Sequence, residues 1–125
     1  MLKKDILRRK DDFNTIYRKG KSLGDRYVVL FYRKNDLSYN RTAFLASKKV
    51  GNSVERNRAR RLMKENYRSL KDSIRPGYDI IFIARNTING MKAYDVGRSM
   101  KCALKRAKLS AHQRDEKQNQ KRNKR

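Results

Sequence analysis

The sequence has few of the side chains that protein catalysts and protein metal sites use. Its 125 residues include one cysteine (Cys102), one histidine (His112), one proline and no tryptophan. A single cysteine excludes an internal disulfide, and one Cys with one His cannot complete a zinc site of the usual four-ligand kind. The sequence therefore shows no metal site on the protein itself, and we expect a reducing, cytoplasmic location.

Acidic residues and long apolar runs are also scarce. Twelve Asp and Glu face thirty-five Lys and Arg, so the formal net charge is +23. The longest apolar runs lie at residues 27–32 and 80–84, far short of the roughly 20 residues of a membrane-spanning helix. The opening MLKKDILRRKDD lacks the apolar segment of a secretory signal. We therefore expect neither a membrane span nor secretion.

The excess of positive charge indicates a polyanionic partner. Self-repulsion destabilises a compact state, and a bound polyanion relieves it. With a sequence pI near 10.7, nucleic acid is the first candidate partner and an anionic membrane surface the second. The scattered carboxylates and single His provide no Ser-His-Asp set, no Cys-His set and no two-metal carboxylate cluster. We therefore expect no catalytic residue on the protein itself.

Six elements are predicted from periodicity and breaker residues: helix 10–19, strands 26–34 and 41–49, a helix from about 53 to 74, strand 78–84 and helix 91–109. Asn52 is a plausible N-cap with Glu55 as its capping-box partner. The order α-β-β-α-β-α predicts an α+β fold, a two-layer sandwich of a small mixed sheet and packed helices. Residues 1–109 form the predicted domain, and the basic segment 110–125 is expected to be disordered.

The predicted helix after Gly51 has an apolar side and a cationic side. The apolar side holds Val54, Ala59, Leu62, Met63 and Leu70, and the opposite side holds Asn57, Arg60, Arg61, Lys64, Arg68 and Lys71. Solvated helix faces usually mix charges of both signs, whereas residues 48–71 carry nine basic and two acidic side chains. Because arginine binds phosphate through two parallel hydrogen bonds, this face predicts contact with nucleic acid.

Aromatic residues suggest a second surface. The chain has seven Tyr and four Phe; Phe13 and Tyr17 share one face of the first predicted helix, and Phe31 lies on the strand 26–34. Two interpretations are open. The rings can be core, which is the better interpretation for Phe13 alone, or they can stack on single-stranded bases, worth roughly 1–3 kcal/mol each.

The segment SKKVGNSVERNRARR at residues 47–61 resembles the signature of the bacterial ribonuclease P protein component. The flanking residues agree: Asp12, Phe13, Tyr17, Gly20, Arg26, Phe31 and the strand YDIIFIAR. The resemblance covers residues 3–109. It implies an RNA-binding subunit that assists a catalytic RNA in cleaving the 5′ leader from precursor tRNA. It also implies a left-handed βαβ crossover across residues 41–84, where the general rule predicts a right-handed one.

The resemblance implies two sets of site residues. Those facing the catalytic RNA are Lys48, Arg56, Asn57, Arg58, Arg60, Arg61, Lys64 and Arg68. Those lining a leader-binding cleft are Phe13, Tyr17, Arg26, Phe31 and Lys49. The position matching Phe31 is often Tyr in relatives, so we expect a hydroxyl contact to be missing here and stacking to be retained.

The same resemblance implies the partners and cofactor. The partners are the ribonuclease P catalytic RNA and the precursor tRNA leader, with one monomeric protein per RNA and no membrane. Mg²⁺ is expected to be held mainly by the RNA, which carries the endoribonuclease chemistry. The alternatives are a ribosomal protein or RNA chaperone, a DNA-binding regulator using residues 53–71 as its recognition helix, and a self-sufficient protein nuclease.

Overall fold

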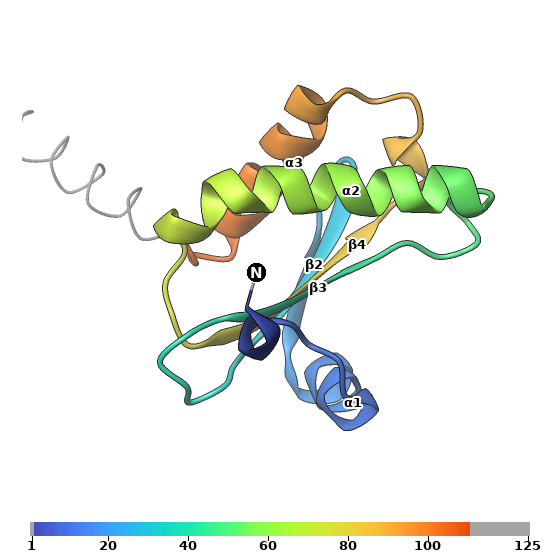
Figure 1. Ribbon diagram of the computed structural model, residues 1–125. Helices are drawn as coiled ribbons and strands as arrows, with labels where there is room; N and C mark the ends of the chain where they lie inside the picture. The colour runs from blue at the N-terminus through green and yellow to red at the C-terminus, as the bar shows by residue number, and fades with distance from the viewer. Residues whose placement is uncertain (1, 111–125) are drawn as a thin grey trace, which may run out of the picture.

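The fold is a four-stranded sheet with helices on both faces (Figure 1). The computed structural model describes residues 2–110. Its main elements are α1 (Lys10–Lys19), β1 (Lys21–Gly24), β2 (Val28–Lys34), β3 (Arg41–Leu45), α2 (Ser53–Leu70), β4 (Tyr78–Ala84) and α3 (Ala93–Arg106). Short 3-10 turns lie at Lys3–Asp5, Lys71–Ser73 and Asn86–Ile88.

The sheet has the strand order β1-β2-β4-β3. Strand β4 runs antiparallel to β2 and parallel to β3, and its residue Ile81 is paired with Phe31 on one side and Ala43 on the other. The segment β3-α2-β4 is therefore a βαβ unit, as predicted; the left-handedness of its crossover stays a prediction from the resemblance. Strand β3 lies at an edge of the sheet, so all of its residues pair with β4 on one side, and on its outer side the described residues add only the bridge from Ile6 to Thr42.

The main core lies between the sheet and the helices α2 and α3. It includes Leu30 and Phe82 from the sheet, Met63 and Tyr67 from α2, and Met100 from α3. A smaller core on the opposite face joins α1 to the sheet (Figure 1). The predicted α+β class, with a mixed sheet and packed helices, is confirmed, and α1 adds a third layer to the predicted two.

Element boundaries depart from the predictions where local sequence is weakest. Strand β1, with the sequence KSLG, was not predicted because it is short and mostly polar; its pairing with β2 defines it. Strand β3 ends at Leu45, because residues 48–50 form a turn before Gly51. Helix α2 ends at Leu70, and a 3-10 turn follows it.

One residue of the predicted apolar side of α2 was placed wrongly. Ala59, Leu62 and Met63 are buried as expected, and Tyr67 joins them at 4% exposure. Val54 is 76% exposed. It lies in the first turn of the helix, before the first buried residue of α2, Ala59, so the periodicity alone could not show that the sheet does not reach it.

The described chain ends in contact with the fold. Ser110 bridges to Ile74, and the N–H of Arg75 donates to the carbonyl of Leu109 at 2.8 Å. Apart from Ser110, the predicted disordered tail lies outside the described residues. Between residues 2 and 110, no helix is both long enough and apolar enough to span a membrane.

Candidate nucleic-acid interface

The start of α2 is fixed by the predicted capping box. The side chain of Asn52 accepts a hydrogen bond from the N–H of Glu55 at 2.9 Å, and Glu55 Oε1 accepts from the N–H of Asn52 at 3.1 Å. Gly51 has a φ of 145°, and a Cβ there would collide with the Glu55 carboxylate. Glycine is therefore required to place this cap, and the cap sets where the arginines of α2 point.

The outer face of α2, defined by Asn57, Arg60, Arg61, Lys64 and Arg68, is largely open to solvent. All but the half-buried Arg60 are exposed, and Arg60 donates a hydrogen bond to Asn57 Oδ1. None of the three ion pairs formed within residues 2–110 involves this face. Its positive charge is therefore available to a polyanion.

Two other predicted RNA contacts on α2 behave differently. The half-buried Arg58 donates to the carbonyl of Met91 at 2.7 Å, which ties α2 to the segment before α3. Arg56 donates to Ser53 Oγ at 3.2 Å. Arg58 thus has a structural contact that the sequence did not reveal. Lys48 is exposed in the turn before α2.

Three predicted cleft residues come together as an aromatic cluster of Phe13, Tyr17 and Phe31. The ring centroids of Phe13 and Tyr17 lie 6.4 Å apart, and those of Tyr17 and Phe31 lie 5.1 Å apart and nearly perpendicular. Tyr17 is 41% exposed, and the two Phe rings are half-buried against the smaller core. Burial raises the pKa of Tyr17, so its phenol is neutral. The cluster is therefore both core and accessible surface.

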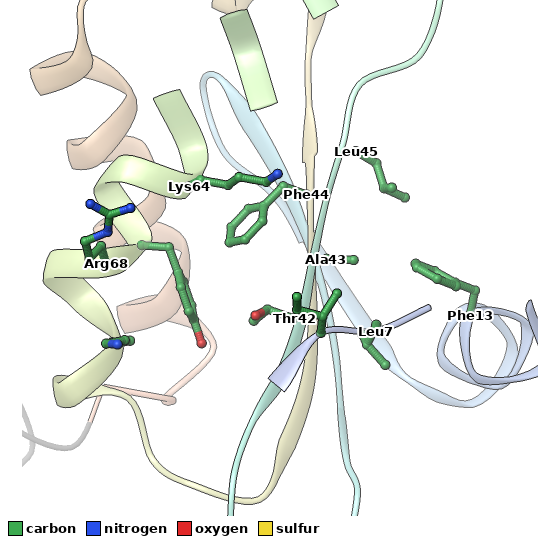
Figure 2. A pocket seen from close by; sticks show the side chains of 11 residues that line it. Leu7, Phe13, Thr42, Ala43, Phe44, Leu45, Lys64 and Arg68 are labelled. Atoms are coloured by element: carbon green, nitrogen blue, oxygen red, sulfur yellow. The ribbon is translucent and has the colours of Figure 1, made fainter. Parts of the chain in front are cut away.

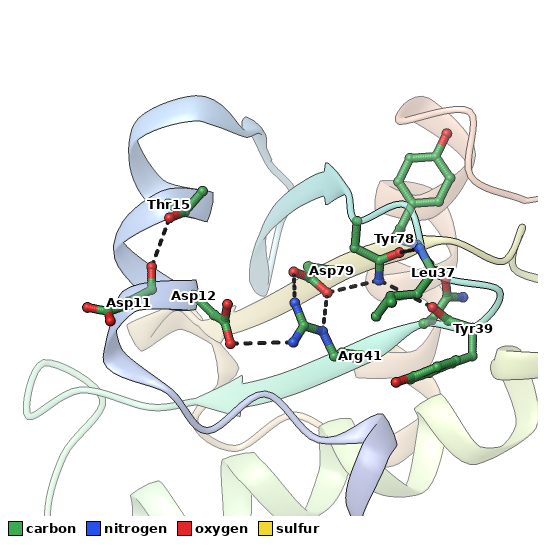
Figure 3. Close-up of polar contacts among 10 residues, drawn as sticks. Asp11, Asp12, Thr15, Leu37, Tyr39, Arg41, Tyr78 and Asp79 are labelled. Atoms are coloured by element: carbon green, nitrogen blue, oxygen red, sulfur yellow. Dashed lines mark hydrogen bonds and ion pairs between the residues drawn. The ribbon is translucent and has the colours of Figure 1, made fainter.

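A partly buried ion pair holds α1 and this cluster in place (Figure 3). Arg41 donates to both carboxylate oxygens of Asp79, at 2.8 and 2.7 Å, and pairs with Asp12 at 3.4 Å. The Asn35 amide adds a third hydrogen bond to Asp79, at 3.0 Å. Hydrogen bonding to Asp79 raises the pKa of Arg41. Since Asp12 precedes Phe13, the network anchors the start of α1 on the sheet.

This network was missed at the level of sequence. The available signal was Asp79, a carboxylate inside the otherwise apolar strand YDIIFIA. A carboxylate at such a position is rarely buried unless it is paired, and Asp79 is 4% exposed. The partner Arg41 could not be identified because it lies 38 positions earlier.

The remaining predicted cleft residues lie apart from the aromatic cluster. Lys49 is exposed in the turn after β3. Arg26 lines a 260 Å³ pocket on the α3 side of the sheet, together with Tyr27, Arg98 and Ser99. The structure thus assembles only part of the predicted cleft, and the leader-binding roles of Arg26 and Lys49 stay predictions.

The backbone around Arg26 is held firmly against α3. Asp25 Oδ1 accepts from the N–H of Arg26 at 2.8 Å and from the hydroxyl of Ser99 at 2.7 Å, and Arg106 pairs with Asp25 Oδ2 at 3.2 Å. Thr87 donates to the carbonyl of Arg26 at 2.6 Å. Burial by itself raises the pKa of Asp25, but these hydrogen bonds outweigh it and lower the pKa below its ordinary value.

A groove of about 440 Å³ at the free edge of β3 connects the outer face of α2 with the aromatic cluster. Lys64 and Arg68 lie on one side of β3, and Leu7 and Phe13 lie on the other (Figure 2). The two predicted surfaces are therefore adjacent across a single edge strand.

Comparison with known proteins decides the family. Residues 1–108 match the ribonuclease P family. This chain belongs to the ribonuclease P protein family. It is 42% identical over 105 residues to the ribonuclease P protein component of Clostridioides difficile, which covers 83% of this chain and 92% of the relative.

Solved ribonuclease P proteins have the same fold. A Staphylococcus aureus RNase P protein, a mutant with defective mRNA degradation activity, has a TM-score of 0.80 and 34% identity, covering 86% of this chain and 91% of that one. The RNase P protein from Thermotoga maritima has a TM-score of 0.74 and 33% identity, covering 80% and 94%. The resemblance and the fold class are confirmed, and family membership implies an RNA partner within a ribonuclease P holoenzyme.

Several of the described carboxylates of this ribonuclease P protein are already engaged by neighbouring groups. Within residues 2–110 no group of three or more His, Cys, Asp or Glu side chains is arranged to hold a metal. Asp79 and Asp25 are engaged by cationic side chains, and Glu55 and Asp95 accept from backbone N–H groups at helix starts.

Proposed function

We propose that this ribonuclease P protein binds the catalytic RNA through the outer face of α2 and the 5′ leader of precursor tRNA through the aromatic cluster. The observation that supports this is the adjacency of the two surfaces across β3: cations without carboxylate partners on one side, and half-exposed rings on the other. Phosphate contacts give affinity, and ring faces stack on unpaired bases. The cluster therefore suits a single-stranded leader.

The proposed mechanism is substrate capture with charge screening. The protein adds a binding surface for the leader beside the catalytic RNA, because one fold carries both surfaces. The cations of α2 lower the repulsion between two RNA polyanions that must lie close together. Family membership supports cleavage by the RNA, with Mg²⁺ held there.

Three further parts of the proposal rest on the resemblance. One protein monomer assembles with each catalytic RNA, the holoenzyme works in the cytoplasm, and no membrane is involved. The family match argues against a ribosomal protein, an RNA chaperone or a DNA regulator. Leader cleavage by the chain mixed with its RNA subunit at low magnesium tests the assembly, and cleavage without added RNA would instead support a protein nuclease.

The first test removes one guanidinium from the outer face of α2. Arg60→Ala should weaken binding to the catalytic RNA and lower the slope of log affinity against log salt concentration by about one unit. Arg8→Ala removes an exposed arginine elsewhere and is the matched control. A slope that is unchanged by Arg60→Ala, or changed equally by both variants, would contradict the RNA-facing role of α2.

The second test concerns the aromatic cluster. Phe31→Ala should weaken binding of leader-bearing precursor tRNA by roughly 1–3 kcal/mol, the value of one stacked base, while mature tRNA binds as before. Phe31→Leu keeps most of the apolar volume but removes the ring, and it should show the same selective loss of leader-bearing tRNA as Phe31→Ala. This result would separate lost stacking from lost packing. Equal losses for both RNAs would refute the leader assignment.

A further inference from the structure

A second cationic concavity lies between α2 and α3, separate from the surfaces assigned above. It is a groove of about 580 Å³. Its polar and aromatic lining consists of Tyr94, Arg98, Lys101 and Lys105 from α3 and of Asn66 and Ser69 from α2. The aromatic cluster lies on the opposite face of the sheet, where α1 packs. We refer to this concavity as the α2–α3 groove.

The cations of the α2–α3 groove are available to a ligand. Arg98, Lys101 and Lys105 are exposed, and none of them forms an ion pair within residues 2–110. No carboxylate lines the groove. Their spacing of three and then four residues places them on one face of α3, and seven residues span about 10 Å along a helix. The row is therefore long enough for more than one phosphate.

An aromatic ring completes the lining. Tyr94 is 72% exposed, and the guanidinium carbon of Arg98 lies 5.9 Å from the centre of its ring. An exposed ring beside an arginine is a combination on which nucleic-acid bases stack, whatever their sequence. An exposed Tyr on a helix that has a well-buried opposite side is not needed for the core.

The groove has rigid walls because α2 and α3 approach closely at Gly97. The amide of Asn66 donates to the carbonyl of Leu62 at 2.9 Å and to that of Ala93 at 3.0 Å, which joins the two helices. A Cβ at Gly97 would collide with Asn66 Oδ1. This close approach explains a glycine inside a helix, where glycine is otherwise unfavourable.

We propose that the α2–α3 groove binds a segment of single-stranded RNA, with phosphates on Arg98, Lys101 and Lys105 and a base stacked on Tyr94. The regular row of cations matches the evenly spaced phosphates of an RNA strand. The exposed Tyr94 ring favours RNA over an acidic protein, because nucleic-acid bases can stack on it. The inference goes beyond the proposed function, which uses none of the residues that line this groove.

The first experiment compares two triple variants of equal charge in the full chain. Arg98→Gln/Lys101→Gln/Lys105→Gln removes the cations of the groove, and Lys3→Gln/Lys10→Gln/Lys34→Gln removes three exposed lysines elsewhere. Binding to the catalytic RNA and to oligouridylate is measured against salt. The groove variant should lower the salt slope by about 2 for one of these RNAs, at about 0.7 per single-strand phosphate. Equal changes in the two variants would overturn the proposal.

Stacking is tested by a pair of variants at one position. Tyr94→Ala should weaken binding of the same RNA about tenfold, which corresponds to the loss of one stacked base. Tyr94→Phe keeps the ring and should bind like the parent chain. Tyr94 is exposed, so its replacement should leave the fold intact. If Tyr94→Ala binds this RNA with unchanged affinity, no base stacks on Tyr94 and this part of the proposal is wrong.

The chain's one cysteine offers a direct probe of occupancy. Cys102 is exposed and lines the groove, and its hydrogen bond to Asp25 raises the pKa of the thiol. Alkylation by N-ethylmaleimide should slow when RNA is bound. This protection should be lost in the groove variant and kept in the control variant. If RNA bound elsewhere slowed alkylation only through its charge, the protection would instead persist in both variants.

The ligands tested in this assay identify the source of the RNA. Protection by the catalytic RNA assigns the segment to the ribozyme, and protection by oligouridylate assigns it to an unstructured substrate. Protection by polyglutamate alone, or by none of these polymers, would overturn the proposal. If the groove variant loses RNA binding while Arg60→Ala does not, the proposed role of α2 fails and the groove stands.

Discussion

The outer face of α2 and the aromatic cluster are built in opposite ways. The α2 face is a row of side chains on one helix, exposed except for the half-buried Arg60 and without ion pairs among the described residues. The aromatic cluster combines α1 with β2 and depends on an ion pair between β3 and β4. Charge can therefore be changed on α2 with little structural cost, whereas the cluster is coupled to folding.

The strongest test of this contrast breaks the ion pair between Arg41 and Asp79. Asp79→Ala leaves Arg41 with only its longer contact to Asp12, and the loss of two hydrogen bonds between charged groups costs about 3 kcal/mol of unfolding free energy. Urea unfolding measures the loss. Asp72→Ala removes an exposed carboxylate and should change the stability little. If the two variants unfold alike, the ion pair does not hold the fold.

The matching change on α2 should affect binding and not folding. Arg68→Gln should weaken the complex with the catalytic RNA by about 1.5 kcal/mol, the value of one hydrogen bond to a charged group. Its urea midpoint should stay that of the parent chain, because Arg68 is exposed. A lowered midpoint would show that the α2 face also supports the fold, and the contrast would fail.

A third prediction concerns pH and the turn that carries Arg26. Asp25→Asn should cost about 1 kcal/mol near pH 7, because the charge-assisted bonds to Ser99 and Arg106 weaken. The folded pKa of Asp25 is lowered below its ordinary value of 3.8, so this stability is present above that value and is lost as pH falls through the folded pKa.

Unfolding measured across this acid range checks the prediction. The difference between Asp25→Asn and the parent chain should disappear at the acid end of the series. A difference that is constant with pH would mean that the Asp25 charge contributes nothing to stability.

The smallest expected effect is at Val54. Val54→Ser should change the unfolding free energy by less than about 0.5 kcal/mol, as for other exposed positions, because this side chain is 76% exposed. The buried Met63 of the same helix gives the contrast: Met63→Ala should cost roughly 2–5 kcal/mol. Comparable losses at the two positions would mean that the sheet covers the first turn of α2.

Much of the fold could be predicted because its elements have strong local periodicity. The residue range of α1 and of β4 and the capping box of α2 agree with the predictions. Strand β1 could not be predicted, because its four residues include only one partly buried side chain and show no periodic pattern. Its place depends on its pairing with β2.

The candidate sites divide in the same way. The positions of the exposed cations of α2 could be predicted from the spacing of residues on one helix. The resemblance to the family implied that their partner is the catalytic RNA. Arg26 shows the limit: the resemblance groups it with the aromatic residues, but it lines a pocket beside α3. Arg26 lies in the turn between β1 and β2. The path of the chain through this turn determines which residues surround Arg26, and the local sequence does not reveal that path.

The sequence by itself determined the charge, the helical periodicity that separates cations from core on α2, and the signature that indicates the family. The tertiary structure alone decided the Arg41–Asp79 pair, the meeting of the aromatic cluster with the α2 cations across β3, and the α2–α3 groove. The physical reason is range. Periodicity and capping act within a few residues, whereas these contacts join segments far apart in the chain, whose positions are set by packing of the whole core.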